Sequence, residues 1–113
     1  MSVSFTRGAI LVLGLATGLI HLVVLNTQMG HLDPLFTLNG LGYLTLIAVF
    51  FLNPPIVAGR RRQLSLLLMG FAGATILAWV FLGDRGPLGI GTKVIEALLI
   101  LTLLVDLRQT QKA

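Results

Sequence analysis

The chain has 113 residues, 56% of them hydrophobic and 11% charged, with a formal net charge of +4 and no cysteine. Because soluble domains carry about 25% charged residues, and a core of this size cannot hide so much apolar surface, the composition excludes a soluble enzyme and favours a membrane protein surrounded by lipid. The lack of cysteine excludes disulfides and thiolate metal sites, and the positive charge does not indicate a nucleic-acid partner, because three of the eight cations form the run Arg60-Arg61-Arg62 between apolar segments.

The first two apolar segments are separated by a short polar stretch. A membrane helix needs roughly 20 apolar residues, and the first predicted helix covers about residues 8–26 before NTQMG interrupts the pattern. Asp33 followed by Pro34 is typical of an N-cap with proline at the first helical position. The second predicted helix therefore covers about 34–52, and the asparagine and two prolines at 53–55 end it.

The last two helices are predicted from two further apolar segments. The third covers about residues 63–82. The fourth has two candidate starts, Pro87 and Thr92, and the length of the span decides between them. A helix from Thr92 to Asp106 is only about 22 Å long, too short for a bilayer core of about 30 Å, whereas a start at Pro87 reaches that length. We therefore predict a fourth helix over about 87–107.

The distribution of cations predicts how these helices lie in the cell membrane. Four spans with short loops predict an all-α membrane protein, an antiparallel up-down bundle with both termini on one side. Only Arg85 and Lys93 fall on or near the opposite side. Since cytoplasmic loops carry the excess of lysine and arginine, both termini are predicted to be cytoplasmic. The cations on that side are Arg7, Arg60, Arg61, Arg62, Arg108 and Lys112.

Small residues mark two faces at which helices could pack closely. Gly14 and Gly18 form a GxxxG step in the first helix, and His21 shares their face. The third helix carries a similar patch that includes Gly70 and Ala74. The first helix is therefore expected to pack against the second or third, with a dimerisation face as the alternative.

Glu96 is the most unusual residue of the predicted spans. It lies about nine residues into the fourth helix, near the bilayer centre, where an ionisable group is costly and marks a candidate functional site. Lys93 is a candidate partner at i, i+3. Two interpretations remain open: a buried functional carboxylate, or a Lys93–Glu96 pair near the outer interface with the lysine extending towards water.

Three other polar residues are predicted to converge with Glu96 in the outer half of the bundle. Tyr43 and Asn39 share a face of the second helix, and His21 lies near the outer end of the first. They could form separate interhelical hydrogen bonds, or a quinone, haem or proton-relay site. A bis-histidine haem is not expected, because His31 lies in a loop.

The two histidines suggest two weaker cofactor sites, and the sequence has no catalytic motif. His21 could ligate haem alone, or His21, His31 and Asp33 could bind a metal ion on the outer side. The chain contains no P-loop, GxSxG, HExxH or paired-carboxylate signature. We therefore expect no enzymatic activity.

Two functions are compatible with this pattern. The first is an accessory or structural subunit of a larger membrane complex, in which electron transfer is one possibility, bound to other membrane subunits or to itself. The second is a homo-oligomeric, proton-coupled transporter of small molecules that uses Glu96. In length and helix count the chain is similar to the small multidrug resistance transporters, but their essential carboxylate lies in the first helix and this first helix has none.

Overall fold

The computed structural model describes residues 2–57, 59–82 and 86–111, and this part of the chain contains helices and no strand. Four helical stretches are long and apolar enough to cross a membrane, with mean hydropathies between 1.9 and 2.4. They comprise Ser4–Gln28, Pro34–Leu52, Arg61–Phe81 and Pro87–Gln109. By length and composition, these stretches indicate a membrane protein.

The first helical rod is longer than the range 8–26 that the sequence predicts. It consists of α1 (Val3–Leu19), a π-helical turn η1 (Ile20–Val24) and α2 (Leu25–Met29). It begins early because the Ser2 hydroxyl caps it and accepts a hydrogen bond from the Phe5 N–H at 3.1 Å. It continues to Gly30, whose φ of 76° ends the helix in the left-handed conformation.

The second predicted helix, 34–52, coincides with α3 (Pro34–Leu52). Asp33 caps it, since its carboxylate accepts a hydrogen bond from the Phe36 N–H at 2.9 Å. At the other end, Asn53 takes a left-handed φ of 47° and a short 3-10 turn, η2 (Pro55–Val57), follows. The cap and the proline pair thus act as the local sequence suggests.

The last two helices are α4 (Arg61–Leu82) and α5 (Pro87–Gln111). The α4 helix begins slightly before the predicted residue 63, so it includes two residues of the arginine run. Helix α5 starts at Pro87 and not at Thr92, which confirms the choice made from length. It extends beyond the predicted end at 107.

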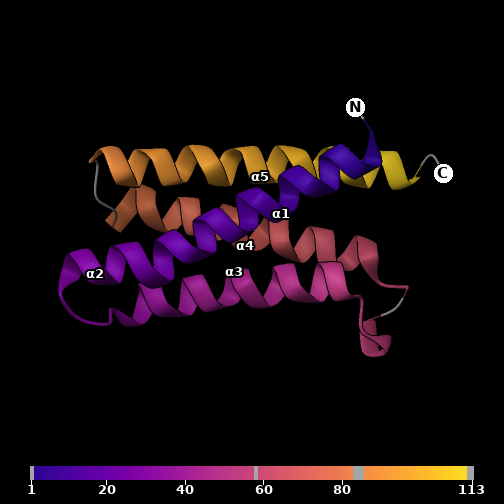
Figure 1. Ribbon diagram of the computed structural model, residues 1–113. Helices are drawn as coiled ribbons and strands as arrows, with labels where there is room; N and C mark the ends of the chain where they lie inside the picture. The colour runs from indigo at the N-terminus through magenta and orange to yellow at the C-terminus, as the bar shows by residue number, and fades with distance from the viewer. Residues whose placement is uncertain (1, 58, 83–85, 112–113) are drawn as a thin grey trace.

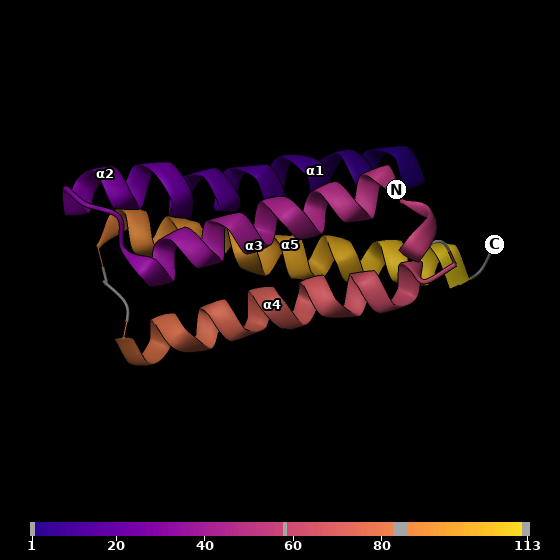
Figure 2. The same cartoon turned by 90° about the horizontal axis from the view of Figure 1, so that it is seen from below.

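The helices lie side by side, as Figures 1 and 2 show. Helix α1 contacts α3 and α5, and α4 contacts the same two helices. Both termini lie at one end of the molecule, where α3 also leads into α4, and we call this the terminal end (Figure 1). The opposite end holds α2, the end of α4 and the start of α5, and we call it the α2 end.

Glycines bring α1 close to α3. A Cβ added at Gly14 would overlap the Ile47 side chain, and one added at Gly18 would lie 3.3 Å from Tyr43 Cβ. The first small-residue face therefore packs against the second long helix. Gly70 and Ala74 differ from the prediction: both are exposed, and a Cβ at Gly70 would meet no described atom within 4 Å. Because α1 packs between α3 and α5, this face of α4 points away from it.

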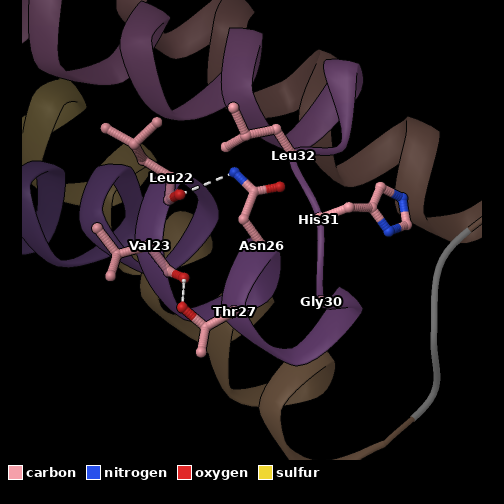
Figure 3. A pocket seen from close by; sticks show the side chains of 7 residues that line it. All are labelled: Leu22, Val23, Asn26, Thr27, Gly30, His31 and Leu32. Carbon is pink, nitrogen blue, oxygen red and sulfur yellow. Dashed lines mark hydrogen bonds between the residues drawn. The ribbon is translucent and has the colours of Figure 1, made fainter.

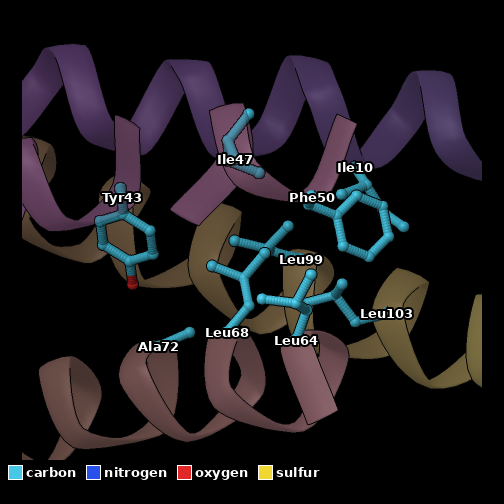
Figure 4. Close-up of a cluster of buried hydrophobic side chains, with 9 residues drawn as sticks. All are labelled: Ile10, Tyr43, Ile47, Phe50, Leu64, Leu68, Ala72, Leu99 and Leu103. Atoms are coloured by element: carbon cyan, nitrogen blue, oxygen red, sulfur yellow. The ribbon is translucent and has the colours of Figure 1, made fainter. Parts of the chain in front are cut away.

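Nine buried side chains form the apolar core (Figure 4). They come from all four long helices, and Tyr43 lies at one edge of the cluster. The other members are Ile10, Ile47, Phe50, Leu64, Leu68, Ala72, Leu99 and Leu103. Beyond Tyr43, towards the α2 end, the interior becomes polar.

Candidate functional site

A buried carboxylate stands at the centre of the polar region. Glu96 of α5 is 0% exposed, and its Oε2 accepts a hydrogen bond from the Tyr43 hydroxyl at 2.6 Å. Its Oε1 forms an ion pair with the Lys93 ammonium one turn earlier on the same helix. Tyr43 is also 0% exposed. The negative charge thus has a cation and a hydroxyl donor, which offset the cost of taking it out of water.

His21 lies on the π-helical turn η1 and is buried against Tyr43, with 6.1 Å between the two ring centroids. Its Nδ1 lies 2.8 Å from the Thr17 carbonyl oxygen. Because a carbonyl only accepts, this contact requires the proton on Nδ1 and leaves the Nε2 of a neutral ring as an acceptor. No described residue provides a partner for Nε2. Single π-helical turns are frequent at functional sites.

Asn39 faces α4 instead of Tyr43. Its amide Nδ2 donates to Thr75 Oγ1 at 2.6 Å, and the Thr75 hydroxyl donates to the Phe71 carbonyl at 3.0 Å. Since the Thr75 proton is used on Phe71, Thr75 can only accept from Asn39, which assigns the amide orientation. Asn39 Oδ1 is buried and has no hydrogen-bond partner among the described residues. Thr75 was not a candidate from sequence, because a threonine in a helix commonly bonds its own backbone.

A cavity of about 450 Å³ brings together three of the five residues predicted to form a binding site. His21, Asn39 and Lys93 line it, while Tyr43 and Glu96 lie behind its wall. Its volume falls in the range of about 300–1,000 Å³ typical of small-molecule sites. The other lining residues come from α2, the N-cap and first turn of α3, α4 and α5: Leu25, Asp33, Leu35, Phe36, Thr75, Ala78, Trp79, Gly89 and Thr92.

The metal site considered from sequence is not assembled. His31 is exposed in the loop after Gly30 and borders a different surface hollow of about 500 Å³, where its ring points away from Asn26 (Figure 3). Among the described residues, no three histidine or carboxylate side chains are grouped closely enough to hold a metal ion. The Asp33 carboxylate caps α3, although the residue also lines the cavity beside His21.

Sequence reasoning missed a second buried carboxylate at the terminal end. Asp106 is 1% exposed, and its Oδ1 accepts a hydrogen bond from Arg7 Nε at 3.1 Å. Nearby, Arg61 lies over the Phe50 ring, 4.1 Å from its centroid, and donates to the Phe50 carbonyl at 3.3 Å. Opposite charges at the same predicted depth of the first and fourth helices are the signal that could have revealed the Arg7–Asp106 pair.

The comparison with known families gives one result. A family of unknown function, DUF7475, matches residues 3–106, and the chain therefore belongs to this family. No curated protein and no solved structure matches the chain. The matched region includes every residue of the cavity wall and the Glu96 cluster, which consists of Tyr43, Lys93 and Glu96. Since the family has no known function, the function has to be argued from the chemistry of these residues.

Proposed function

We propose that this DUF7475 protein is a four-helix protein of the cell membrane that binds a small lipophilic molecule of the quinone class. The observation that carries the proposal is the cavity lined by His21, Asn39 and Lys93 beside the Tyr43–Glu96 hydrogen bond. Ligand sites are mostly apolar and hold a few convergent polar groups, and this cavity has that composition. Its aromatic residues, Phe36 and Trp79, suit a flat ring.

The neighbouring charges add a second reason to favour a quinone. Quinones exchange protons as well as electrons, and the Lys93–Glu96 pair with the Tyr43 hydroxyl is a proton-holding group next to the cavity. Lys93 lines the cavity and Glu96 does not, so a proton could pass between the ligand and Glu96 through Lys93. A bound quinone would also carry electrons, and this protein would then serve as the quinone-binding subunit of a redox complex.

We further propose an antiparallel up-down bundle with cytoplasmic termini, which puts the cavity in the outer half of the membrane. The terminal end carries Arg7, the run at 60–62 and Arg108, whereas Arg85 and Lys112 lie outside the described residues. An excess of arginine at one end favours that end as cytoplasmic.

Cysteine labelling tests this orientation, because the natural chain has no cysteine. Single cysteines at Ser2, Gly59 and His31 should react with a membrane-impermeant reagent added outside intact cells only at His31. A cell lysate serves as the control in which all three sites react. Labelling at Ser2 and Gly59 but not at His31 in intact cells would reverse the orientation.

Trp79 provides a direct test of ligand binding. It is the single tryptophan of the chain and lines the cavity. Titrating the purified protein in detergent with a decyl-substituted benzoquinone should quench its fluorescence saturably. Ala78→Leu, which adds a large side chain at the cavity wall, should abolish this saturable quenching, and the control variant His31→Leu, which lies outside the cavity, should leave the Kd unchanged. Linear, non-saturating quenching would contradict the proposal. A haem absorption band in the purified protein would show that the bound molecule is haem and not a quinone.

The role of an accessory subunit is a second candidate, favoured by the exposed face of α4. Gly70 and Ala74 are four residues apart and open to the surroundings, and such small residues let another helix approach closely. Purification in a mild detergent followed by mass spectrometry should then recover stable foreign membrane subunits. Recovery of a bare monomer would contradict this role, and a bare homodimer would favour the proton-coupled transporter.

A proton-coupled transporter is the third candidate, and buried Glu96 beside a cavity favours it. Glu96→Gln keeps the shape of the side chain and removes its charge. This variant should insert and assemble normally but lose pH-dependent transport in reconstituted vesicles. Unchanged transport in this variant would exclude Glu96 as the coupling residue.

A further inference from the structure

We propose that the cavity selects the hydrogen-bond-donating form of its ligand, a lipophilic hydroquinone, over the oxidised quinone. This inference rests on the proposed binding function and concerns the balance of donors and acceptors in the cavity wall. A hydroquinone ring carries two hydroxyl groups that both donate and accept, whereas a quinone ring carries two carbonyl groups that only accept.

The hydroxyl groups around the cavity already donate to the protein. Thr92 Oγ1 donates to the Leu88 carbonyl at 2.7 Å, and Thr75 Oγ1 donates to the Phe71 carbonyl. Behind the wall, the Tyr43 hydroxyl donates to Glu96 Oε2. Each of these protons is therefore committed, and the two threonine oxygens have only lone pairs left to offer a ligand.

Two further acceptors lack a donor within the described chain. The contact between His21 Nδ1 and the Thr17 carbonyl makes Nε2 an acceptor, and His21 lines the cavity. The contact between Asn39 Nδ2 and Thr75 leaves Asn39 Oδ1 unpaired and covered by the wall. A rotation of the Asn39 amide towards the cavity would give Oδ1 a partner on the ligand. An acceptor left unpaired in an apolar site is costly, so both favour a donating ligand.

Lys93 is a hydrogen-bond donor on the cavity wall, but it does not reverse the preference for a hydroquinone. Its ammonium has three protons, and the ion pair with Glu96 leaves donor capacity on the cavity side. A hydroquinone hydroxyl can accept from Lys93 and donate to His21 Nε2 at the same time. A quinone carbonyl can satisfy Lys93 but leaves His21 Nε2 and Asn39 Oδ1 without donors.

Three probes of similar ring shape test the inference on the full chain in detergent under anaerobic conditions. They are tetramethylhydroquinone, tetramethylbenzoquinone and the dimethyl ether of the hydroquinone, and calorimetry gives the Kd of each. The hydroquinone should bind at least about tenfold tighter than the other two, as expected when one or two acceptors gain a donor. Equal binding of quinone and hydroquinone would overturn the inference and leave the proposed function intact. Absence of binding by all three would overturn both.

Variants then assign the preference to named acceptors. His21→Phe keeps a ring but removes Nε2, and it should reduce the ratio of quinone Kd to hydroquinone Kd by about three- to tenfold. The matched His31→Phe should not change that ratio. Asn39→Leu should also reduce it, and this half-buried site keeps the test decisive if His21→Phe does not fold. A folded His21→Phe and a folded Asn39→Leu that both retain the full ratio would overturn the inference.

Discussion

Glu96 and Asp106 are two buried carboxylates of α5 with different surroundings. Glu96 is paired with Lys93, whose side chain is only 11% exposed, and it also accepts the Tyr43 hydroxyl. Asp106 is paired with Arg7, whose side chain is 32% exposed. The Glu96 cluster borders a cavity near the α2 end, whereas the Arg7–Asp106 pair joins α1 to α5 at the terminal end.

The difference between the two pairs separates a candidate site from a structural contact. The Arg7 guanidinium is partly exposed, so water can replace the carboxylate as its hydrogen-bond partner at small cost. The Arg7–Asp106 pair therefore mainly holds two helices in register. An ion pair in which both the lysine and the glutamate are withdrawn from water has a much larger desolvation cost. Its charges can also interact with a ligand that enters the cavity beside them. The two pairs therefore predict different responses to substitution.

The largest expected effect belongs to Glu96→Leu. It leaves the Lys93 charge and the Tyr43 hydroxyl without their acceptor, and removing one partner of a buried pair costs about 3–5 kcal/mol. The measurement is the free energy of unfolding in detergent. Lys93→Met combined with Glu96→Leu should recover most of the loss, because no unpaired charge then remains. A near-neutral Glu96→Leu variant would remove the distinction between the two pairs.

Gly14→Leu contrasts the filled part of the interior with the hollow part. Its side chain would be forced into Ile47 and push α1 from α3, and overpacking of this kind costs about 1–3 kcal/mol. Ala78→Leu adds the same side chain at the cavity wall, where it should change the free energy of unfolding by less than about 0.5 kcal/mol and abolish ligand binding. Equal destabilisation by the two variants would show that the cavity is not open in the folded protein.

Arg7→Met should destabilise the protein less than Glu96→Leu, by about 1–2 kcal/mol, because the donor that Asp106 loses already contacts water. Unfolding measured at low salt and at about 1 M salt sharpens the contrast, since salt screens exposed charges more than buried ones. The difference between wild type and Arg7→Met should shrink in high salt, and the difference between wild type and Glu96→Leu should not. A reversed salt response would show that the Lys93–Glu96 pair, and not the Arg7–Asp106 pair, is the one in contact with water.

Local signals in the chain were sufficient for the helices. Apolar segments of sufficient length, the Asp33 cap and the Asn53-Pro54-Pro55 stop predict α3 residue by residue, and span length selects Pro87 as the start of α5. The ends of the first rod were missed, because a single serine at position 2 caps it and Gly30, not Asn26, ends it. These errors concern helix ends, where the hydrophobic pattern fades before the backbone hydrogen bonds do.

The sequence by itself thus determined the spans, the i, i+3 pair of Lys93 with Glu96 and the glycine face of α1, because each depends on one helix and its period. Only the tertiary structure decided which faces meet. It turned Asn39 towards Thr75, joined Arg7 to Asp106, left Gly70 exposed and opened a cavity beside His21. Helical period gives the face of a residue on its own helix, whereas the rotation and offset of neighbouring helices follow from packing summed over all of them.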